Sequence, residues 1–343
     1  MRFELSDTGL GRSATPQTPA VKARAKRRRA DPVPQEAYEF QLLPSWARRN
    51  MQDGSPGAFL TAGASLVLLD GILRQDIPFA GALGHRLALS AAAASAKIMR
   101  LREDEGALRD AMHLSIGEQT GPAGRLHQLW RRLIDLNVQA VAASLNEALN
   151  LLDLADAGEG RAIAERISGH DPAADPVSAA AMAAATVYSS RQTPEGEVLA
   201  FWIADRVLAA RLGWKRPVPL LMTRVLEPAL RRGEDGRRPR PGDVKWVEDA
   251  ARAYASAATN AYRLASQLGR RVEKLIAVQP KLRAKGAARV VDLLLADDCV
   301  SSARAARLAG LSDRAARRLF DRLVELQAVQ EISGRPSFRL YGL

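Results

Sequence analysis

Four arginines on one predicted helix are the residues best suited to bind a charged partner. From Asp313 to Leu326 apolar residues recur every three or four positions, which predicts a helix with one buried stripe. The opposite face carries Arg314, Arg317, Arg318 and Arg322. A guanidinium can bond guanine O6 and N7 together, or bind a phosphate through two parallel hydrogen bonds. A solvated charged face is the ordinary alternative, so the surrounding motif decides between the two.

The segments around this helix predict a helix-turn-helix. Ser301–Ala309 has the periodicity of a short helix, Gly310 interrupts it, and Ser312 is placed to cap the helix that follows. The second helix of such a motif enters the major groove of DNA. Gln327 occupies the position after this helix where similar domains commonly have Gly, and a left-handed cap is more costly without Gly.

The positions of the polar residues on this helix suggest separate roles. Arg314 and Arg317 lie near its N-terminus, so we expect them to contact base edges. Ser312, Arg318 and Arg322 are better placed to bind phosphates and set the register on the duplex.

A short β-hairpin is expected after the helix. Val329–Ser333 and Ser337–Tyr341 alternate in polarity as strands do, with Gly334 and Arg335 at the turn. This pattern is typical of a wing, and it would place Arg335 and Arg339 against the DNA backbone or the adjacent minor groove. The expected DNA-binding set is therefore Ser312, Arg314, Arg317, Arg318, Arg322, Arg335 and Arg339.

The distribution of charge favours nucleic acid as the partner. The chain has 343 residues and a net charge of +12. Residues 1–30 and 281–343 contribute +6 and +5 of that excess, and residues 31–280 are nearly neutral. A basic composition alone would spread the excess along the chain, so its concentration at both ends indicates a polyanionic partner.

Composition and periodicity divide the chain into three parts. Residues 1–35 combine prolines with a run of basic residues and are expected to form a disordered arm. Residues 36–280 are expected to form an all-helical domain, and residues 281–343 a winged helix-turn-helix domain. The expected helices of the middle part are Ala58–Gln75, Ala80–Leu101, Glu103–His113, Ala123–Ala155, Gly160–Ile167, Pro176–Ser189, Glu195–Leu212, Pro219–Arg231 and Asp243–Val278. The predicted fold class is thus mainly α, with a small β-hairpin.

Neither a membrane span nor export is expected. Gly57–Leu73 is the most apolar run, but it is 17 residues long, contains Asp70 and falls short of a bilayer span of roughly 20 residues. The basic N-terminus lacks the apolar core of a signal peptide, and the single Cys299 allows no internal disulfide. These features favour a cytoplasmic protein, and we expect Cys299 to pack between helices of the C-terminal domain.

No catalytic, cofactor or metal site is expected from local motifs. Asp110 and His113 have the three-residue spacing of half a helical-bundle metal site, but the sequence offers no second half, so a solvated acidic helix start is the preferred interpretation. Cys299 has no His near it in sequence. The glycines Gly117, Gly121 and Gly124 lack the strand-turn-helix context of a phosphate loop.

Three phrases of the sequence resemble an uncharacterised bacterial family, catalogued as domain of unknown function 1403. They are Arg102–His113, Gly121–Leu126 and Gly334–Leu343, and the similarity covers Tyr38–Leu343. The loop Gly117–Pro122 departs from the acidic, Pro-rich version typical of that family. The resemblance implies an intracellular bacterial protein and assigns no activity.

Together these patterns predict a DNA-binding protein, most simply a transcriptional regulator. The helical part is expected to self-associate or to sense a ligand, and double-stranded DNA is the expected partner. The alternative is a helical interaction or scaffold protein whose C-terminal winged domain binds protein. The sequence does not define an effector molecule.

Overall fold

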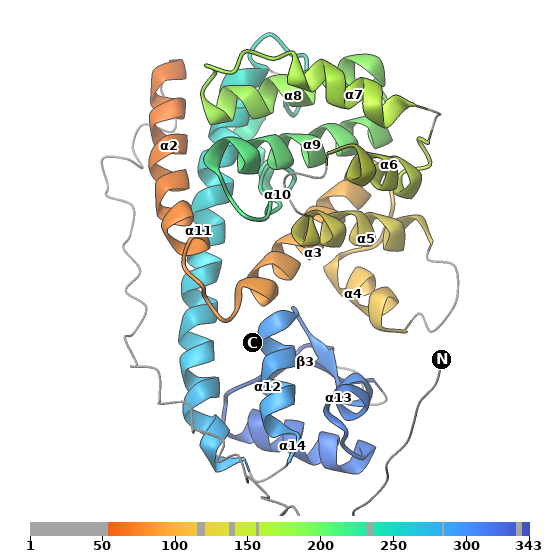
Figure 1. Cartoon of the computed structure of the whole chain (residues 1–343), viewed down its shortest axis with the longest axis vertical. Coiled ribbons are helices and arrows are strands. Elements are labelled where there is room, and N and C mark those ends of the chain that lie inside the picture. Colours follow the sequence, from red (N-terminus) through yellow and green to blue (C-terminus); the bar gives the residue numbers. More distant parts are fainter. Residues whose placement is uncertain are drawn as a thin grey trace, which may run out of the picture. The chain divides into compact units, whose positions relative to one another are not determined.

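The computed structural model describes residues 54–114, 121–136, 141–155, 158–231, 236–282, 285–333 and 338–343. The basic arm predicted for residues 1–35 lies outside them. By contacts the chain divides into Met1–Ala37 and Tyr38–Leu343, and only the second unit contains described residues. Within it, helices dominate and the strands form one small sheet (Figure 1).

The helices before the C-terminal segment are α2 (Gly54–Leu73), α3 (Ala80–Ile98), α4 (Glu105–Leu114), α5 (Pro122–Asp135), α6 (Val141–Leu151), α7 (Glu159–Ser168), α8 (Pro176–Ser190), α9 (Pro194–Leu212), α10 (Leu221–Arg224) and α11 (Trp246–Val278). Short 3₁₀ turns, η1 (Pro228–Leu230) and η2 (Gln279–Lys281), flank the 33-residue α11. The C-terminal segment contains α12 (Ala287–Ala296), β1 (Val300–Ser301), α13 (Ser302–Ala309), α14 (Asp313–Glu325), β2 (Gln330–Glu331) and β3 (Leu340–Gly342).

Pairs of helices that pack along one another form the core of the helical part. α8 packs on α9, α2 on α11, and α3 on α5. α9 shows why these segments form helices: Thr193 caps its N-terminus, Pro194 occupies its first turn, and Gly213 ends it in a left-handed conformation. Its residues Val198 to Ala204 are all buried, so it is surrounded by other elements and is not amphipathic.

Most of the predicted helices are confirmed within a few residues, but Ala123–Ala155 is wrong. That segment contains two helices, because α5 ends at Asp135 and Leu136 is extended with ψ 134°. The two helices of this segment pack on different neighbours, since α5 packs on α3 and α6 packs on α7. Pro219–Arg231 is similarly broken, into the single-turn α10 and η1.

α2 is the one described helix that is long and apolar enough to cross a membrane. Its window Pro56–Leu73 has a mean hydropathy of 1.6, and 39% of that window is buried. Its buried residues face α11, and Leu60 and Val67 on the outer side are 51% and 70% exposed. Core helices of soluble proteins pass the same test of length and composition.

The sheet joins the two ends of the C-terminal segment. β3 lies between β1 and β2, and both pairings are antiparallel. Val300 pairs with Tyr341, and Glu331 pairs with the same Tyr341 from the other side. Two strands were predicted within 329–333 and 337–341, and the observed β2 and β3 are shorter and end at Gly342. β1 was not predicted.

Candidate nucleic-acid interface and the polar network behind it

α14 has the sharply two-sided character that its sequence predicts. The Ser312 hydroxyl accepts a hydrogen bond from the Ala315 N–H at 3.2 Å, and Asp313 places a negative charge in the first turn. Four side chains on one stripe are buried: Ala316, Leu319, Phe320 and Leu323. The four arginines Arg314, Arg317, Arg318 and Arg322 are exposed on the other side. The predicted cap, buried stripe and exposed arginine face of this helix are therefore confirmed.

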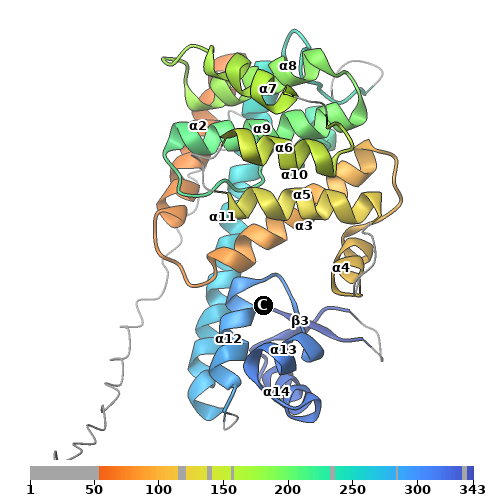
Figure 2. The same ribbon diagram turned by 45° about the vertical axis from the view of Figure 1, so that its right-hand side comes forward.

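The arginines of α14 differ in their ion pairs. Arg322 lies 2.9 Å from Glu325 on the same exposed face. Among described residues, Arg314, Arg317 and Arg318 have no ion-pair partner within 4.0 Å, so their guanidinium groups are available for a ligand. Figure 2 shows α14 at the end of the C-terminal segment that lies away from α7 and α8.

The residues predicted for the wing are described only in part. Arg339 is 48% exposed in its side chain and lies 3.8 Å from both Asp321 and Glu331. These long contacts leave it close to the C-terminal half of α14. Arg335 and Gly334 lie outside the described residues.

A tight turn connects α13 to α14. Gly310 has φ +65°, which a residue without a Cβ adopts at little cost, and Leu311 N–H donates to the Ala306 carbonyl. Next to this turn, Leu311 is partly buried against the core, and Leu308 on α13 is 43% exposed.

Gln327 adopts the left-handed conformation that its position requires. Its φ is +53°. Gln327 N–H donates to the Val324 carbonyl, and Ala328 N–H donates to the Leu323 carbonyl. These two bonds form a Schellman cap, which usually has Gly in the left-handed position. The helix therefore ends as in domains with Gly, and it does so with a strained Gln.

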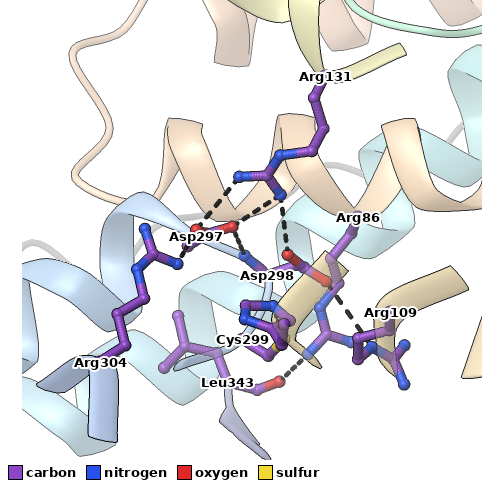
Figure 3. A network of polar contacts seen from close by, with 9 residues as sticks. Arg86, Arg109, Arg131, Asp297, Asp298, Cys299, Arg304 and Leu343 are labelled. Carbon is purple, nitrogen blue, oxygen red and sulfur yellow. Dashed lines mark hydrogen bonds and ion pairs between the residues drawn. The ribbon is translucent and has the colours of Figure 1, made fainter. Parts of the chain in front are cut away.

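Behind this surface, a buried aspartate binds the C-terminal segment to α5. Asp297 follows α12, and its carboxylate accepts hydrogen bonds from Arg131 at 3.0 and 3.2 Å and from Arg304 at 2.6 Å (Figure 3). Burial pushes the pKa of Asp297 upward, but the charge and hydrogen bonds of Arg131 outweigh burial and hold that pKa well below its usual value. Asp297 is thus a permanent anion between two cations.

The next residue, Asp298, is held less completely. Its Oδ1 accepts from Arg131 at 3.3 Å, and its Oδ2 lies 3.8 Å from Arg109 Nε on α4 (Figure 3). Burial and the neighbouring Asp297 raise the pKa of Asp298 to about 7. Arg86 on α3 completes this network by donating to the Leu343 carbonyl.

Cys299 does not pack between C-terminal helices as expected. Its Sγ lies 3.0 Å from Nε2 of His113, at the end of α4, and the two residues are 186 positions apart in sequence. Burial raises the pKa of the Cys299 thiol, which keeps it protonated. The pairing was missed because each residue looks isolated locally. The one sequence signal was a pair of adjacent acids in the apolar stretch 293–300, which requires a cationic partner once buried.

The described part of the basic loop before α11 is held to the helical core at one arginine. Arg238 donates to both carboxylate oxygens of the buried Glu197. Arg237 lies 3.0 Å from Asp243, and both Arg237 and Arg240 are exposed. This part of the loop is therefore anchored at Arg238 and open to solvent at its other two arginines.

The helical part also contains a cavity of about 280 Å³. It lies between α6, α7, α8 and α9 and is mainly apolar. Its polar lining consists of Ser168, His170, Arg206 and Arg211. The described lining therefore has no acidic side chain, and two of its members are cationic.

The chain belongs to the family described as "Protein of unknown function (DUF1403)", which matches residues 33–343. This match confirms the resemblance seen in the sequence. No curated protein matches the chain.

Proposed function

We propose that the chain is a DNA-binding protein, most simply a cytoplasmic bacterial transcriptional regulator that reads DNA through α14. The observation that carries the proposal is the exposed arginine face of α14, with Arg314, Arg317 and Arg318 lacking ion-pair partners among described residues. The buried stripe fixes the orientation of α14, and the helix in turn fixes the face that carries the arginines. Recognition of a DNA groove needs such a face, with positive charge directed towards the duplex.

The arrangement around α14 supports a winged helix-turn-helix. The order α12, β1, α13, α14, β2, β3, with β3 between β1 and β2, is the order such a domain requires. The tight turn at Gly310 and the cap at Ser312 join α13 and α14 in the way that the two helices of such a motif would be joined. In this proposal Arg339 flanks the recognition helix from the wing.

The helical part would supply regulation. The cavity between α6 and α9 has apolar walls and a cationic side, which suits a small organic anion. Self-association through this part would give the two half-sites that helix-turn-helix proteins commonly read.

Fluorescence anisotropy tests the proposal by measuring how the full-length protein binds a labelled random DNA duplex at two salt concentrations. We expect measurable affinity at low salt that falls steeply as salt rises, because binding releases counterions from the phosphates. The absence of salt-dependent binding would favour the competing function, in which the C-terminal segment binds another protein.

A further inference from the structure

Three side chains with metal-binding atoms converge where the C-terminal segment meets α4. His113 Nε2, Cys299 Sγ and a carboxylate oxygen of Asp298 all lie within 4.8 Å of one another. Cys299 and Asp298 are buried and His113 is half-buried. We propose that His113, Asp298 and Cys299 form a binding site for one divalent transition-metal ion, of which Zn²⁺ is the best-suited example.

The types of donor support this class of metal. Thiolate, imidazole and carboxylate are the ligands that Zn²⁺ takes in proteins, and a soft sulfur with a nitrogen disfavours Mg²⁺ and Ca²⁺. Three protein ligands leave one position of a tetrahedron for water or a further donor. His113 Nε2 lies 3.0 Å from Cys299 Sγ, so two of the three donor atoms face each other.

An independent observation at Asp298 also indicates a missing partner. Its Oδ2 is buried and makes no hydrogen bond with any described residue, and the side chain is 2% exposed. The nearest cation, Arg109 Nε, lies 3.8 Å away, which is within ion-pair range but beyond hydrogen-bond range, and this buried nitrogen also makes no hydrogen bond with a described residue. A buried carboxylate oxygen without a hydrogen bond is costly, and a metal ion bound to it would satisfy it directly. Arg131 holds the other oxygen at 3.3 Å and so orients the carboxylate.

Several arginines lie near this site, so its electrostatics have to favour a cation locally. The carboxylates of Asp297 and Asp298, together with the thiolate that forms on binding, would place three negative charges beside Arg109, Arg131 and Arg304. On binding, an S–metal bond replaces the S–H bond of Cys299 and the proton passes to water.

The geometry requires a small adjustment. Ligands about 2.3 and 2.0 Å from a tetrahedral zinc are roughly 3.5 Å apart. Cys299 Sγ and His113 Nε2 are 3.0 Å apart. The two atoms must therefore separate by about half an ångström, which side-chain rotation can provide.

Cobalt titration of the full-length protein tests the site directly. After dialysis against chelator, we expect one Co²⁺ per chain to produce a thiolate-to-cobalt charge-transfer band and the visible bands of a tetrahedral ion, and one Zn²⁺ to displace it. Cys299→Ser should abolish the charge-transfer band. Loss of a residue that only contacts a metal ligand weakens metal binding by about 10- to 100-fold. His113→Gln removes a ligand itself, so it should weaken Co²⁺ binding by more than this.

The matched control is His170→Gln, which changes a half-buried histidine hydrogen-bonded to Thr186 on a distant part of the chain. It should leave Co²⁺ binding unchanged. A wild-type spectrum with only the bands of aqueous Co²⁺ would overturn the proposal, and so would a charge-transfer band that survives Cys299→Ser. If a variant fails to fold, the wild-type spectrum still decides. The readout does not depend on DNA binding, so this proposal and the proposed function can fail separately.

Discussion

The aromatic ring of Phe320 on α14 stacks on the ring of Tyr341 on β3. The ring centroids are 4.2 Å apart and the planes differ by 6°. Both side chains are buried, at 0% and 2% exposure. This contact connects the middle of α14 to the central strand of the sheet, so it fixes the direction in which the arginine face points.

Removing the Phe320 ring should destabilise the fold strongly. We expect Phe320→Ala to lower the free energy of unfolding by about 3–5 kcal/mol, because it leaves a cavity beneath α14. Urea denaturation followed by circular dichroism measures the loss. Val324→Ala, at a 38% exposed position of the same helix, is the matched control and should change stability by less than about 0.5 kcal/mol. Equal losses in the two variants would contradict a packing role for the stacked pair.

The arginines of α14 should divide between base and phosphate contacts. On a selected specific site, Arg317→Ala is expected to cost about 1–3 kcal/mol of binding free energy and to relax sequence preference. Arg318→Ala should weaken all sequences alike and reduce the salt slope by about one unit. Arg161→Ala on α7, which removes an exposed arginine paired with Glu165, serves as the control. Equal losses on specific and random DNA for both α14 variants would refute this division.

Gln327 should be a site where glycine stabilises the protein. At φ +53°, a side chain is strained and glycine is not, so we expect Gln327→Gly to raise the free energy of unfolding by about 0.5–1 kcal/mol. Gln330→Gly is the matched control, because Gln330 lies in β2 and should lose about 0.5–1 kcal/mol through chain entropy. Chemical denaturation measures the change in the free energy of unfolding, which should be positive for Gln327→Gly and negative for Gln330→Gly. A decrease in both variants would contradict backbone strain at Gln327.

The buried Asp297 should be more important for stability than exposed ion pairs. Asp297→Asn removes the anion that Arg131 and Arg304 share and leaves Arg131 only its 3.3 Å contact with Asp298, so we expect a loss of about 3–5 kcal/mol. Glu165→Gln, which removes the partner of exposed Arg161, should cost less than about 0.5 kcal/mol. Both are measured by denaturation in chelator, so that no metal contributes. A cost below about 1 kcal/mol at Asp297 would show that the two arginines find other partners.

Acid should destabilise the protein through His127. Burial lowers the pKa of His127 to about 3, so below its unfolded pKa of 6.5 the unfolded chain takes up a proton that the folded chain does not. Stability from this residue is therefore complete above pH 6.5 and falls as pH decreases towards 3. One proton corresponds to a slope of about 1.4 kcal/mol per pH unit.

His127→Leu removes this titration. As pH falls from 6.5 to 4, the free energy of unfolding of the wild type should decrease by more than that of the variant, because only the wild type has this histidine to protonate on unfolding. Parallel pH profiles for the two proteins would mean that His127 is protonated in the folded state too.

Local signals in the sequence were sufficient to predict α14 and its turn. Ser312 and Gly310 define the ends of two helices through caps that depend on neighbouring residues alone. Periodicity predicted α9 as Glu195–Leu212, within one residue of the observed Pro194–Leu212. It failed at Ala123–Ala155, because periodicity records which face is apolar and not whether one neighbour or two cover it.

The polar network could not have been predicted from the sequence in this way. Arg131 and Asp297 are 166 positions apart, and His113 and Cys299 are 186 apart. Their meeting depends on the packing of α4 and α5 against the C-terminal segment, which no local pattern encodes. β1 could not be predicted either, because two residues are too few to show the alternation of a strand and its partner β3 lies about 40 positions later in the chain.

The aspartates at 297 and 298 also limit how this C-terminal segment can be reused. A chimera that transplants residues 285–343 onto another helical scaffold keeps Arg304 beside Asp297 but leaves behind Arg131 and Arg109, and so exposes Asp298 without either of its cationic partners. The segment is therefore not a self-sufficient module, because part of its charge balance is supplied by α4 and α5.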